Sequence, residues 1–397
     1  MRSFPSGVFS GHIPLYDYIV MWKFLTVIII VALVGLYFWY VRGVEVEPLL
    51  KKAKSIRIRI AFEEEALPPP QDERLGTWES LPDMPTERTE VEVAALGKDI
   101  YVIGGIDGFG RTVNKVEAFD TLKRVWSEAV PLPSGKHHAA AVALGDKLYV
   151  LGGYAGLNFE PTDDLWIFDK GKERWRELKS MPEPLGAMAA IGMEAYTADK
   201  TTVRQETSTD VGAGVEQKLG PEGDAIYVFG GTGEEGLSDK VYMYDVRRNE
   251  WEMKTRMPTA REHLAAATIG DRIFVVGGRK KSITKNLGNL EVYTPAKDIW
   301  VIGPPMPTKR GGIAAATTGG RLYVFGGEEP TKTFDAVEEY DPAEKKWRKM
   351  NPMSRGRHGL GAAEVDEKIY VIGGGKRPLL SVSGLNEVFT SPDKQKE

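Results

Sequence analysis

A short apolar stretch that ends in two adjacent glycines occurs six times along the chain. The copies, with their second glycine, are DIYVIGG (Gly105), KLYVLGG (Gly153), AIYVFGG (Gly231), RIFVVGG (Gly278), RLYVFGG (Gly327) and KIYVIGG (Gly374). These glycines lie 48, 78, 47, 49 and 47 residues apart, and a period just under 50 residues is typical of small sheets repeated along a chain. The long interval predicts one normal repeat that carries an insertion over residues 193–223.

Three further features keep the same phase as the glycine pairs. An alternating strand with an aromatic residue near its end follows each pair, as in VEAFD or VYMYD. A tryptophan comes next in five repeats, at Trp126, Trp175, Trp251, Trp300 and Trp347. A turn related to Met-Pro and then a strand of small residues, such as HLAAATI, complete the unit. Each repeat therefore predicts four strands with a period of two.

The order of these strands predicts their places in a ring of sheets. The small-residue strand fits the innermost position, where space is narrowest, and the strand before the glycines is apolar throughout because both its faces are buried. The two glycines let that strand bend and let a neighbouring backbone approach where a Cβ would prevent it. The tryptophan would fill the wider outer gap between neighbouring sheets.

The two ends of the repeat region predict how the ring closes. The segment GTWESLPDMP, with Trp78, matches the fourth strand of a repeat but precedes the first glycine pair. The last repeat has no tryptophan after NEVFTS. The N-terminal strand therefore completes the last sheet, and closure of the ring leaves no open sheet edge between units. We predict an all-β propeller of six blades over residues 76–394.

In these features the chain resembles the kelch-repeat β-propellers. The resemblance rests on the glycine pairs, on Tyr244-Asp245 and Tyr340-Asp341, on the phased tryptophans and on turns such as MPTAR. It implies the six-bladed fold and, for function, either a protein-binding module or one of a few enzymes.

A separate segment precedes the repeats. Residues 24–41 read FLTVIIIVALVGLYFWYV and carry no charge, which predicts a transmembrane helix within residues 21–42. No small-residue cleavage site follows, so we expect an uncleaved anchor after an N-terminal tail of residues 1–20, with Met21 as an alternative start. Residues 43–75, which include KKAKSIRIRI and AFEEEALPPPQDER, predict a solvated connector.

The flanking charges and the resemblance to signal-anchored proteins disagree about the orientation of this anchor. Arg2 and Lys23 precede the apolar segment. The C-terminal flank carries Arg42, Lys51, Lys52, Lys54, Arg57 and Arg59. The positive-inside rule then favours a cytoplasmic propeller. We expect an extracytoplasmic propeller on the resemblance, against this count.

Composition excludes several functions. The net charge is −4 and charged residues make up 27%, so the chain has no basic field of the kind that binds nucleic acid. It contains no cysteine, which excludes disulfides, thiolate nucleophiles and cysteine-based zinc sites. No sequence motif predicts a catalytic site or a cofactor.

The turns between blades carry the candidate ligand-binding residues. In the kelch fold these turns lie on one face, and the fourth residue after the Met or its equivalent is Arg88, Lys136, Leu185, Arg261, Arg310 and Arg357. Two positions on, the sequence has His138 and His263. The seven candidates are Arg88, Lys136, His138, Arg261, His263, Arg310 and Arg357. They would form a cationic funnel for an acidic peptide, carboxylate or phosphate. The alternative is structural, in which the arginines bind carbonyl groups of the neighbouring blade.

Four histidines lie in or beside these turns, namely His137, His138, His263 and His358. Because they come from different blades of a wide ring, we do not expect them to share a metal ion.

We therefore expect a membrane-tethered binding module that presents a basic turn face to a protein or an anionic ligand. Two alternatives stay open. One is an enzyme similar to the N-acetylneuraminate epimerases, six-bladed kelch proteins that act on an acidic sugar. The other is an architectural protein that binds partners through the sides of the ring.

Overall fold

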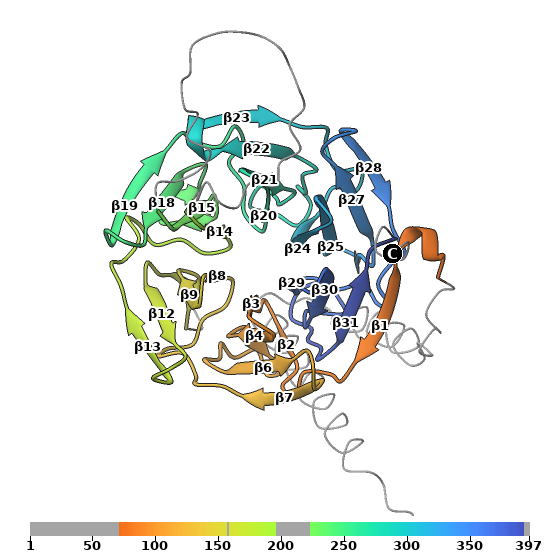
Figure 1. The fold of residues 1–397 in the computed structure, drawn as a ribbon, viewed down its shortest axis with the longest axis horizontal. Coiled ribbons are helices and arrows are strands. Elements are labelled where there is room, and N and C mark those ends of the chain that lie inside the picture. The colour runs from red at the N-terminus through yellow and green to blue at the C-terminus, as the bar shows by residue number, and fades with distance from the viewer. Residues whose placement is uncertain (1–70, 157–158, 196–222, 393–397) are drawn as a thin grey trace, which may run out of the picture. The chain divides into compact units, whose positions relative to one another are not determined.

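The computed structural model describes residues 71–156, 159–195 and 223–392 and shows six antiparallel sheets around a central axis (Figure 1). Each sheet has four main strands that pair in radial order, from a small-residue strand near the axis to a tryptophan-bearing strand at the periphery. The predicted all-β, six-bladed propeller is confirmed.

The main strands of the six blades are as follows, from the inner to the outer strand of each blade. Blade one has β3 (Glu92–Leu96), β4 (Asp99–Ile103), β6 (Val116–Asp120) and β7 (Val125–Glu128). Blade two has β8 (Ala140–Leu144), β9 (Lys147–Leu151), β12 (Leu165–Asp169) and β13 (Arg174–Glu177). Blade three has β14 (Ala189–Met193), β15 (Ala225–Phe229), β18 (Val241–Asp245) and β19 (Glu250–Lys254). Blade four has β20 (Ala265–Ile269), β21 (Arg272–Val276), β22 (Leu290–Thr294) and β23 (Ile299–Ile302). Blade five has β24 (Gly311–Thr318), β25 (Arg321–Glu329), β27 (Val337–Asp341) and β28 (Lys346–Lys349). Blade six has β29 (Gly361–Val365), β30 (Lys368–Ile372), β31 (Asn386–Thr390) and β1 (Thr77–Leu81).

Short elements lie in the turns and loops between the main strands. They are η1 (Glu73–Leu75), β2 (Arg88–Thr89), β5 (Ile106–Asp107), β10 (Tyr154–Ala155), β11 (Glu160–Pro161), β16 (Thr232–Gly233), β17 (Gly236–Leu237), η3 (Pro295–Lys297) and β26 (Lys332–Thr333).

The ring closes as predicted, through a strand from the N-terminal end of the propeller. β1 pairs antiparallel with β31, with Trp78 opposite Phe389, so the outer strand of blade six comes from the opposite end of the chain. The inner strands contact one another in a complete circuit, β3 to β8, β14, β20, β24, β29 and back to β3. Every main sheet therefore packs between two others.

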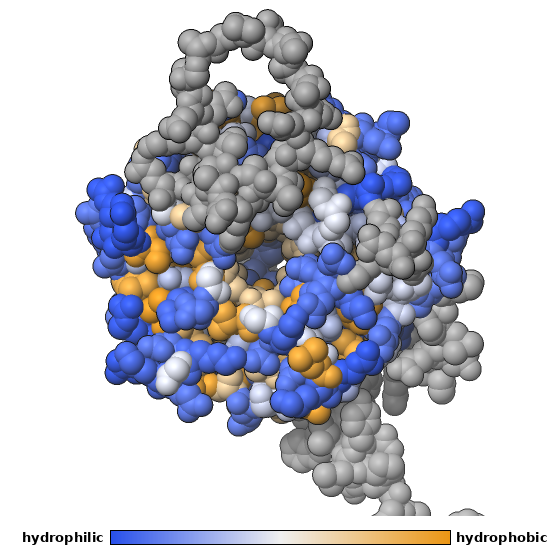
Figure 2. Space-filling model, viewed as in Figure 1, coloured by the Kyte–Doolittle hydropathy of each residue, from blue (hydrophilic) through white to orange (hydrophobic). Residues whose placement is uncertain are grey.

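Burial explains why the second strand of each blade is apolar at nearly every position. Ile100 and Tyr101 of β4 are 0% and 4% exposed, although successive residues of a strand point to opposite faces of the sheet. The outer strands, in contrast, place charged side chains in solvent, and the outer wall is largely hydrophilic (Figure 2). β23, with the sequence IWVI, is an exception and exposes Val301 and Ile302.

Each pair of neighbouring blades has its own apolar core. The core between blades six and one, for example, joins Val365 and Tyr370 to Ile100 and Val102, and Trp126 packs on its outer side. Trp175, Trp251, Trp300, Trp347 and Trp78 pack in the same way against the other five cores. The tryptophans therefore fill the outer gaps, as predicted.

The tryptophans also link each blade to the one before it by a hydrogen bond. Trp126 Nε1 donates to the carbonyl oxygen of Pro82, at 2.8 Å, and Trp78 Nε1 donates to that of Asn351, at 2.9 Å. The equivalent bonds of Trp175, Trp251, Trp300 and Trp347 are 2.8–3.0 Å long.

The glycine pairs form a second set of contacts between blades. The second glycine of each pair donates its N–H to the turn of the next blade, as Gly327 does to the carbonyl of Arg357 at 2.8 Å. The first glycine has a φ of +65° at Gly326, and an added Cβ there would lie 2.4 Å from the same carbonyl oxygen. The structure thus confirms that the glycines permit a close backbone approach and a conformation that other residues rarely adopt.

The boundaries of the propeller differ slightly from the prediction. Residues 71–75, which we expected in the connector, pack against the turn that follows blade five, where Asn351 Nδ2 donates to the carbonyl of Asp72 at 2.7 Å. Most of the predicted insertion over residues 193–223 lies outside the described residues. So do the predicted tail, anchor and most of the connector. Among the described residues, no helix is long and apolar enough to cross a bilayer, and the anchor stays a prediction.

Candidate functional site

Four of the candidate arginines lie inside the blades rather than at the surface. Arg88, Arg261, Arg310 and Arg357 are each 0% exposed. Each forms an ion pair with a glutamate at the second position of the third strand of its blade, with N–O distances of 2.5–2.9 Å. These glutamates are Glu117, Glu291, Glu338 and Glu387.

The same guanidinium groups bind carbonyl oxygens of their own blade. Arg310, for example, donates to Gly326 at 2.6 Å and to Ala336 at 2.9 Å. Burial lowers the pKa of Arg310, and the charge of Glu338 opposes this effect. The arginine is therefore structural, as the alternative supposed, but it joins the second and third strands of its own blade rather than binding the neighbouring blade.

In the two blades without a turn arginine, the glutamate of the third strand is also replaced. In blade two, Lys136 lies over the ring of Trp166 at 5.1 Å and also pairs with Asp164. In blade three, Leu185 and Tyr242 take the two positions, and Leu185 is 1% exposed. The turn residue is therefore a cation only in the blades whose third strand provides a glutamate or a tryptophan ring as its partner.

The cationic funnel that the sequence predicts is not formed by these turn residues, because their charges are buried and paired. Lys136 is also only 2% exposed. Among the described residues, most exposed cations of this face lie further out, on the loops that follow the glycine pairs of blades four to six, and Arg111 lies on the corresponding loop of blade one. Those of blades four to six are Lys280, Lys281, Lys285, Lys332, Lys376 and Arg377. Of the seven candidates, His138 and His263 line the two cavities described below, and ligand contact by them stays a prediction.

Two columns of residues in the turns and loops build this face. The residue after the turn cation pairs through its backbone with the residue after the glycine pair, as Thr89 does with Ile106 and Glu262 with Arg279. The pairing recurs at His137 with Tyr154, Gly186 with Thr232, Gly311 with Glu328 and His358 with Gly375.

The next residue of each turn projects toward the axis. We call these six positions the axial residues: Glu90, His138, Ala187, His263, Gly312 and Gly359. All six have a positive φ, between 50° and 68°. Glu90, His138, Ala187 and His263 adopt this conformation although they carry a side chain, which costs about 1 kcal/mol or more at each.

The axial residues are joined in a circle of backbone hydrogen bonds. Ala187 N–H donates to His138, His263 to Ala187, Gly312 to His263 and Gly359 to Gly312, at 2.8–3.1 Å. His138 N–H donates to Glu90 at 3.4 Å, and Val91 N–H closes the circle onto Gly359 at 3.3 Å. The positive φ therefore turns each peptide toward the neighbouring blade, and the circle fixes the positions of the axial side chains.

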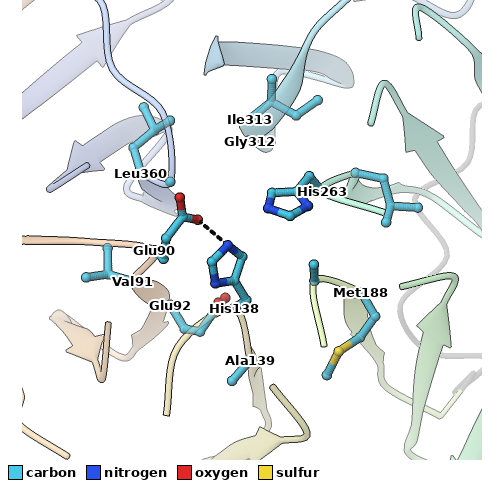
Figure 3. A pocket seen from close by; sticks show the side chains of 13 residues that line it. Glu90, Val91, Glu92, His138, Ala139, Met188, His263, Gly312, Ile313 and Leu360 are labelled. Atoms are coloured by element: carbon cyan, nitrogen blue, oxygen red, sulfur yellow. Dashed lines mark ion pairs between the residues drawn. The ribbon is translucent and has the colours of Figure 1, made fainter. Parts of the chain in front are cut away.

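Three axial side chains meet at the centre of the ring (Figure 3). Glu90 Oε2 lies 3.1 Å from His138 Nε2, and the rings of His138 and His263 are 4.8 Å apart between centroids. Our expectation that a wide ring separates these histidines is wrong, because the turns extend inward to the axis. A cavity of about 80 Å³ lies among the axial residues.

A larger cavity of about 570 Å³ opens beside them, in the size range of small-ligand sites. It is lined by Glu90, His138, His263, Glu262, Arg279, Glu328, His358, Tyr154, Phe159, Leu379 and Leu380, among others. Arg279 connects its polar groups. The guanidinium donates to Glu328 Oε1 and to His263 Nε2, both at 2.8 Å, and contacts Glu262 Oε1 at 3.4 Å.

Ionisation makes this cavity acidic rather than basic. Burial lowers the pKa of His137 to about 4 and that of His138 well below its usual range, so both are neutral at pH 7. Burial would raise the pKa of Glu262, but His263 and Arg279 outweigh it and lower the value to about 2. Three glutamates, Glu90, Glu262 and Glu328, line this cavity, and one arginine, Arg279, contacts the last two of them.

The prediction from sequence did not include Tyr154, Thr232 and Glu328, because it rested on the turn cations, the positions two residues beyond them and the basic loops of blades four to six, where Arg279 lies. Arg279 and Glu328 directly follow a glycine pair, as do Tyr154 and Thr232. Comparison of the residue after each pair would have identified this column. Glu262 adjoins His263 in the same turn, but glutamates are too common in turns to be identified as site residues from the sequence.

Comparison with known proteins shows the family. The family model described as the Attractin/LZTR1 beta-propeller matches residues 100–382. Curated relatives include Kelch-like protein terF of Aspergillus terreus (strain NIH 2624 / FGSC A1156), which is 27% identical over 235 residues. Kelch-like protein 41b of Danio rerio is 26% identical over 218 residues, and Beta-scruin of Limulus polyphemus is 35% identical over 225 residues.

The matches cover about half of this chain and a smaller share of each relative. They span 54% of the chain and 45% of the Aspergillus protein, 54% and 31% for the Danio protein, and 55% and 17% for Beta-scruin. Among solved structures, the one titled "Structure of YjhT" has a TM-score of 0.60 over 78% of this chain and 97% of its own, at 15% identity, which shows a common fold. From its six repeats and the match over residues 100–382, the chain belongs to the kelch-repeat β-propellers, in the Attractin/LZTR1 family.

Proposed function

We propose that the protein is a binding module and that a partner protein docks on its loop face. The loop face is the face formed by the turns before the inner strands and the loops after the glycine pairs. The observation that carries the proposal is a set of exposed apolar side chains on this face. Phe109 is 74% exposed, Leu379 and Leu380 are each 70% exposed, and Phe159 is 48% exposed.

These side chains come from the loops of three consecutive blades, six, one and two. The loops of blades six and one approach each other at Gly108 and Val382, where an added Cβ would lie 3.6 Å from Val382 Cγ2. Phe159 packs edge-on against His137, with 4.6 Å between ring centroids, and it lines the larger cavity together with Leu379 and Leu380. Exposed apolar groups around a polar hollow are typical of protein interfaces, in which a few large side chains supply most of the binding energy.

A capture experiment tests the loop face against the side of the ring. The variant Phe109→Ser/Leu379→Ser/Leu380→Ser removes the apolar loop tips. Its control, Val301→Ser/Ile302→Ser, removes side chains that are 56% and 75% exposed on the outer strand β23. We expect the loop variant to lose at least ~90% of the partner that crosslinks to the wild-type protein, since interface anchors contribute ~2 kcal/mol or more each.

The β23 variant is expected to retain the same partner. Partner loss in the β23 variant alone would place the interface on the side of the ring, as the architectural alternative requires. Equal retention by both variants would contradict the proposed docking face. Circular dichroism spectra identical to wild type establish that each variant is folded.

The alternative of a sugar epimerase is not favoured. That activity was expected to use a basic pocket for the carboxylate of the sugar, but the turn arginines are buried and the cavity is lined by three glutamates and one arginine, Arg279. The likeness to the structure of YjhT, at 15% identity, concerns the fold alone.

We also propose that residues 24–41 anchor the protein in a membrane, with the propeller on the extracytoplasmic side. The support is the uncharged apolar run in the sequence, whose length lies within the range of about 17–25 residues that spans a bilayer as a helix. External protease added to intact cells is expected to release the propeller. Protection until the cells are lysed would instead support the orientation that the flanking positive charges predict.

A further inference from the structure

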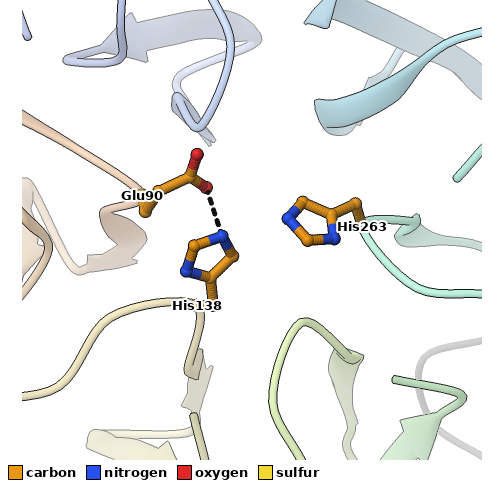
Figure 4. Close-up of side chains that lie close together, drawn as sticks. All are labelled: Glu90, His138 and His263. Atoms are coloured by element: carbon orange, nitrogen blue, oxygen red, sulfur yellow. Dashed lines mark ion pairs between the residues drawn. The ribbon is translucent and has the colours of Figure 1, made fainter. Parts of the chain in front are cut away.

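Three metal-ligating side chains converge on the axis of the propeller. Glu90, His138 and His263 occupy equivalent axial positions in blades one, two and four (Figure 4). One carboxylate oxygen and one ring nitrogen of each histidine lie within 4.8 Å of one another. The closest pair, Glu90 Oε2 and His138 Nε2, is 3.1 Å apart, close to the separation of two ligands on one small ion with bonds of about 2.0–2.1 Å.

The other three axial residues leave room beside these ligands. Ala187, Gly312 and Gly359 have small side chains or none, and the cavity among the six has a volume of about 80 Å³. A water molecule occupies about 30 Å³ in the liquid, so an ion with one or two bound waters fits this space. The circle of axial residues therefore has metal-ligating side chains on one part and open space for bound water on the other.

We propose that Glu90, His138 and His263 bind a divalent first-row transition metal ion, such as Zn²⁺, at the axis. Two imidazoles and one carboxylate form a donor set that such ions prefer, and water from the cavity completes the coordination. Hard ions such as Ca²⁺ prefer six or more oxygen ligands, and this site supplies too few.

Neighbouring groups orient the three ligands. His138 Nδ1 lies 2.6 Å from His137 Nδ1, which leaves Nε2 directed at the axis. The second oxygen of Glu90 faces His358 Nε2 at 3.4 Å. Such outer contacts fix the orientation of metal ligands. The circle of backbone hydrogen bonds holds the positions from which the three side chains project.

Arg279 competes with the metal for one ligand. Its NH2 group donates to His263 Nε2 at 2.8 Å, and metal binding at this nitrogen must break that bond. The guanidinium keeps Glu328 and Glu262 as partners when it moves away. Removal of the positive charge of Arg279 should therefore strengthen metal binding, whereas replacement of a metal ligand should weaken it.

Metal titration of the chelator-treated full chain tests the proposal. Isothermal titration with Zn²⁺ and visible absorption with Co²⁺ are expected to give one ion per chain. Glu90→Gln and His263→Asn should each weaken binding by about tenfold or more. Asparagine is chosen at 263 because it tolerates a positive φ better than most residues. Arg279→Met should strengthen binding by about tenfold.

Glu177→Gln, which changes an exposed carboxylate on β13, serves as the control and should bind like the wild type. Absence of a saturable site in the wild-type protein would overturn the proposal. Equal affinity in the wild-type, Glu90→Gln and His263→Asn proteins would do so as well, because the ion would then bind elsewhere. The test does not depend on the partner protein and so stands apart from the proposed function.

Discussion

Replacing Glu338 with glutamine while Arg310 remains is expected to lower the free energy of unfolding by about 3–5 kcal/mol. The change preserves the shape of the side chain but removes the charge that faces Arg310 at 2.9 Å. The guanidinium is 0% exposed, so no water can replace the lost partner. Urea-induced unfolding, followed by tryptophan fluorescence, measures the difference.

Blade three shows how the same position tolerates the loss of both charges. There Leu185 and Tyr242 take the places of Arg310 and Glu338. The double variant Arg310→Leu/Glu338→Tyr is therefore expected to recover most of the stability lost in Glu338→Gln, since apolar pairs can replace buried ion pairs at little cost. An unfolding midpoint for Glu338→Gln equal to that of the wild type would show that the buried charge needs no partner.

Removal of β1 is expected to have the largest effect on the fold. A chain that begins at Asp83 lacks the five residues that pair with β31 and lacks Trp78, which packs against Phe325 and Phe389. Loss of a packed tryptophan alone costs about 3–5 kcal/mol, comparable with the total stability of many domains at about 5–15 kcal/mol. Thermal unfolding followed by circular dichroism should show a strongly lowered or absent cooperative transition. A chain that begins at Gln71 is the control.

The missing strand can be supplied as a separate peptide. A peptide of residues 71–82 is expected to restore the transition of the shortened chain, because β1 joins β31 through backbone hydrogen bonds and side-chain packing. The same peptide with Trp78→Ala should restore less. If the shortened chain unfolds at the temperature of the control chain, closure by β1 contributes little to stability.

The fold could be predicted from the sequence because its determinants are local and repeated. Each glycine pair marks the place where a buried strand approaches the next blade, and each tryptophan marks an outer strand. The place of a strand within the repeat therefore predicts how far that strand lies from the axis of the propeller. The closure could be predicted for the same reason. The strand with Trp78 has the sequence features of an outer strand, and only the last repeat lacks an outer strand of its own.

The site was predicted less well because its geometry depends on distances across the ring. The turns that carry His138 and His263 are separated by 125 residues in sequence but meet at the axis, which no local pattern indicates. The sequence did contain a sign that the arginines are structural. A glutamate stands at the second position of the third strand in the four blades that have an arginine, such as Arg88 with Glu117, and in neither of the others.

The closed circuit of contacts between blades also affects how the molecule can lose its structure locally. A linear array of repeats has two terminal units, and each can detach after breaking one interface. In this ring every blade has two neighbours, and the axial residues of all six are linked in one circle. A single blade can leave only if two interfaces fail together, so partial unfolding from a free end is suppressed everywhere except at the outer strand of blade six.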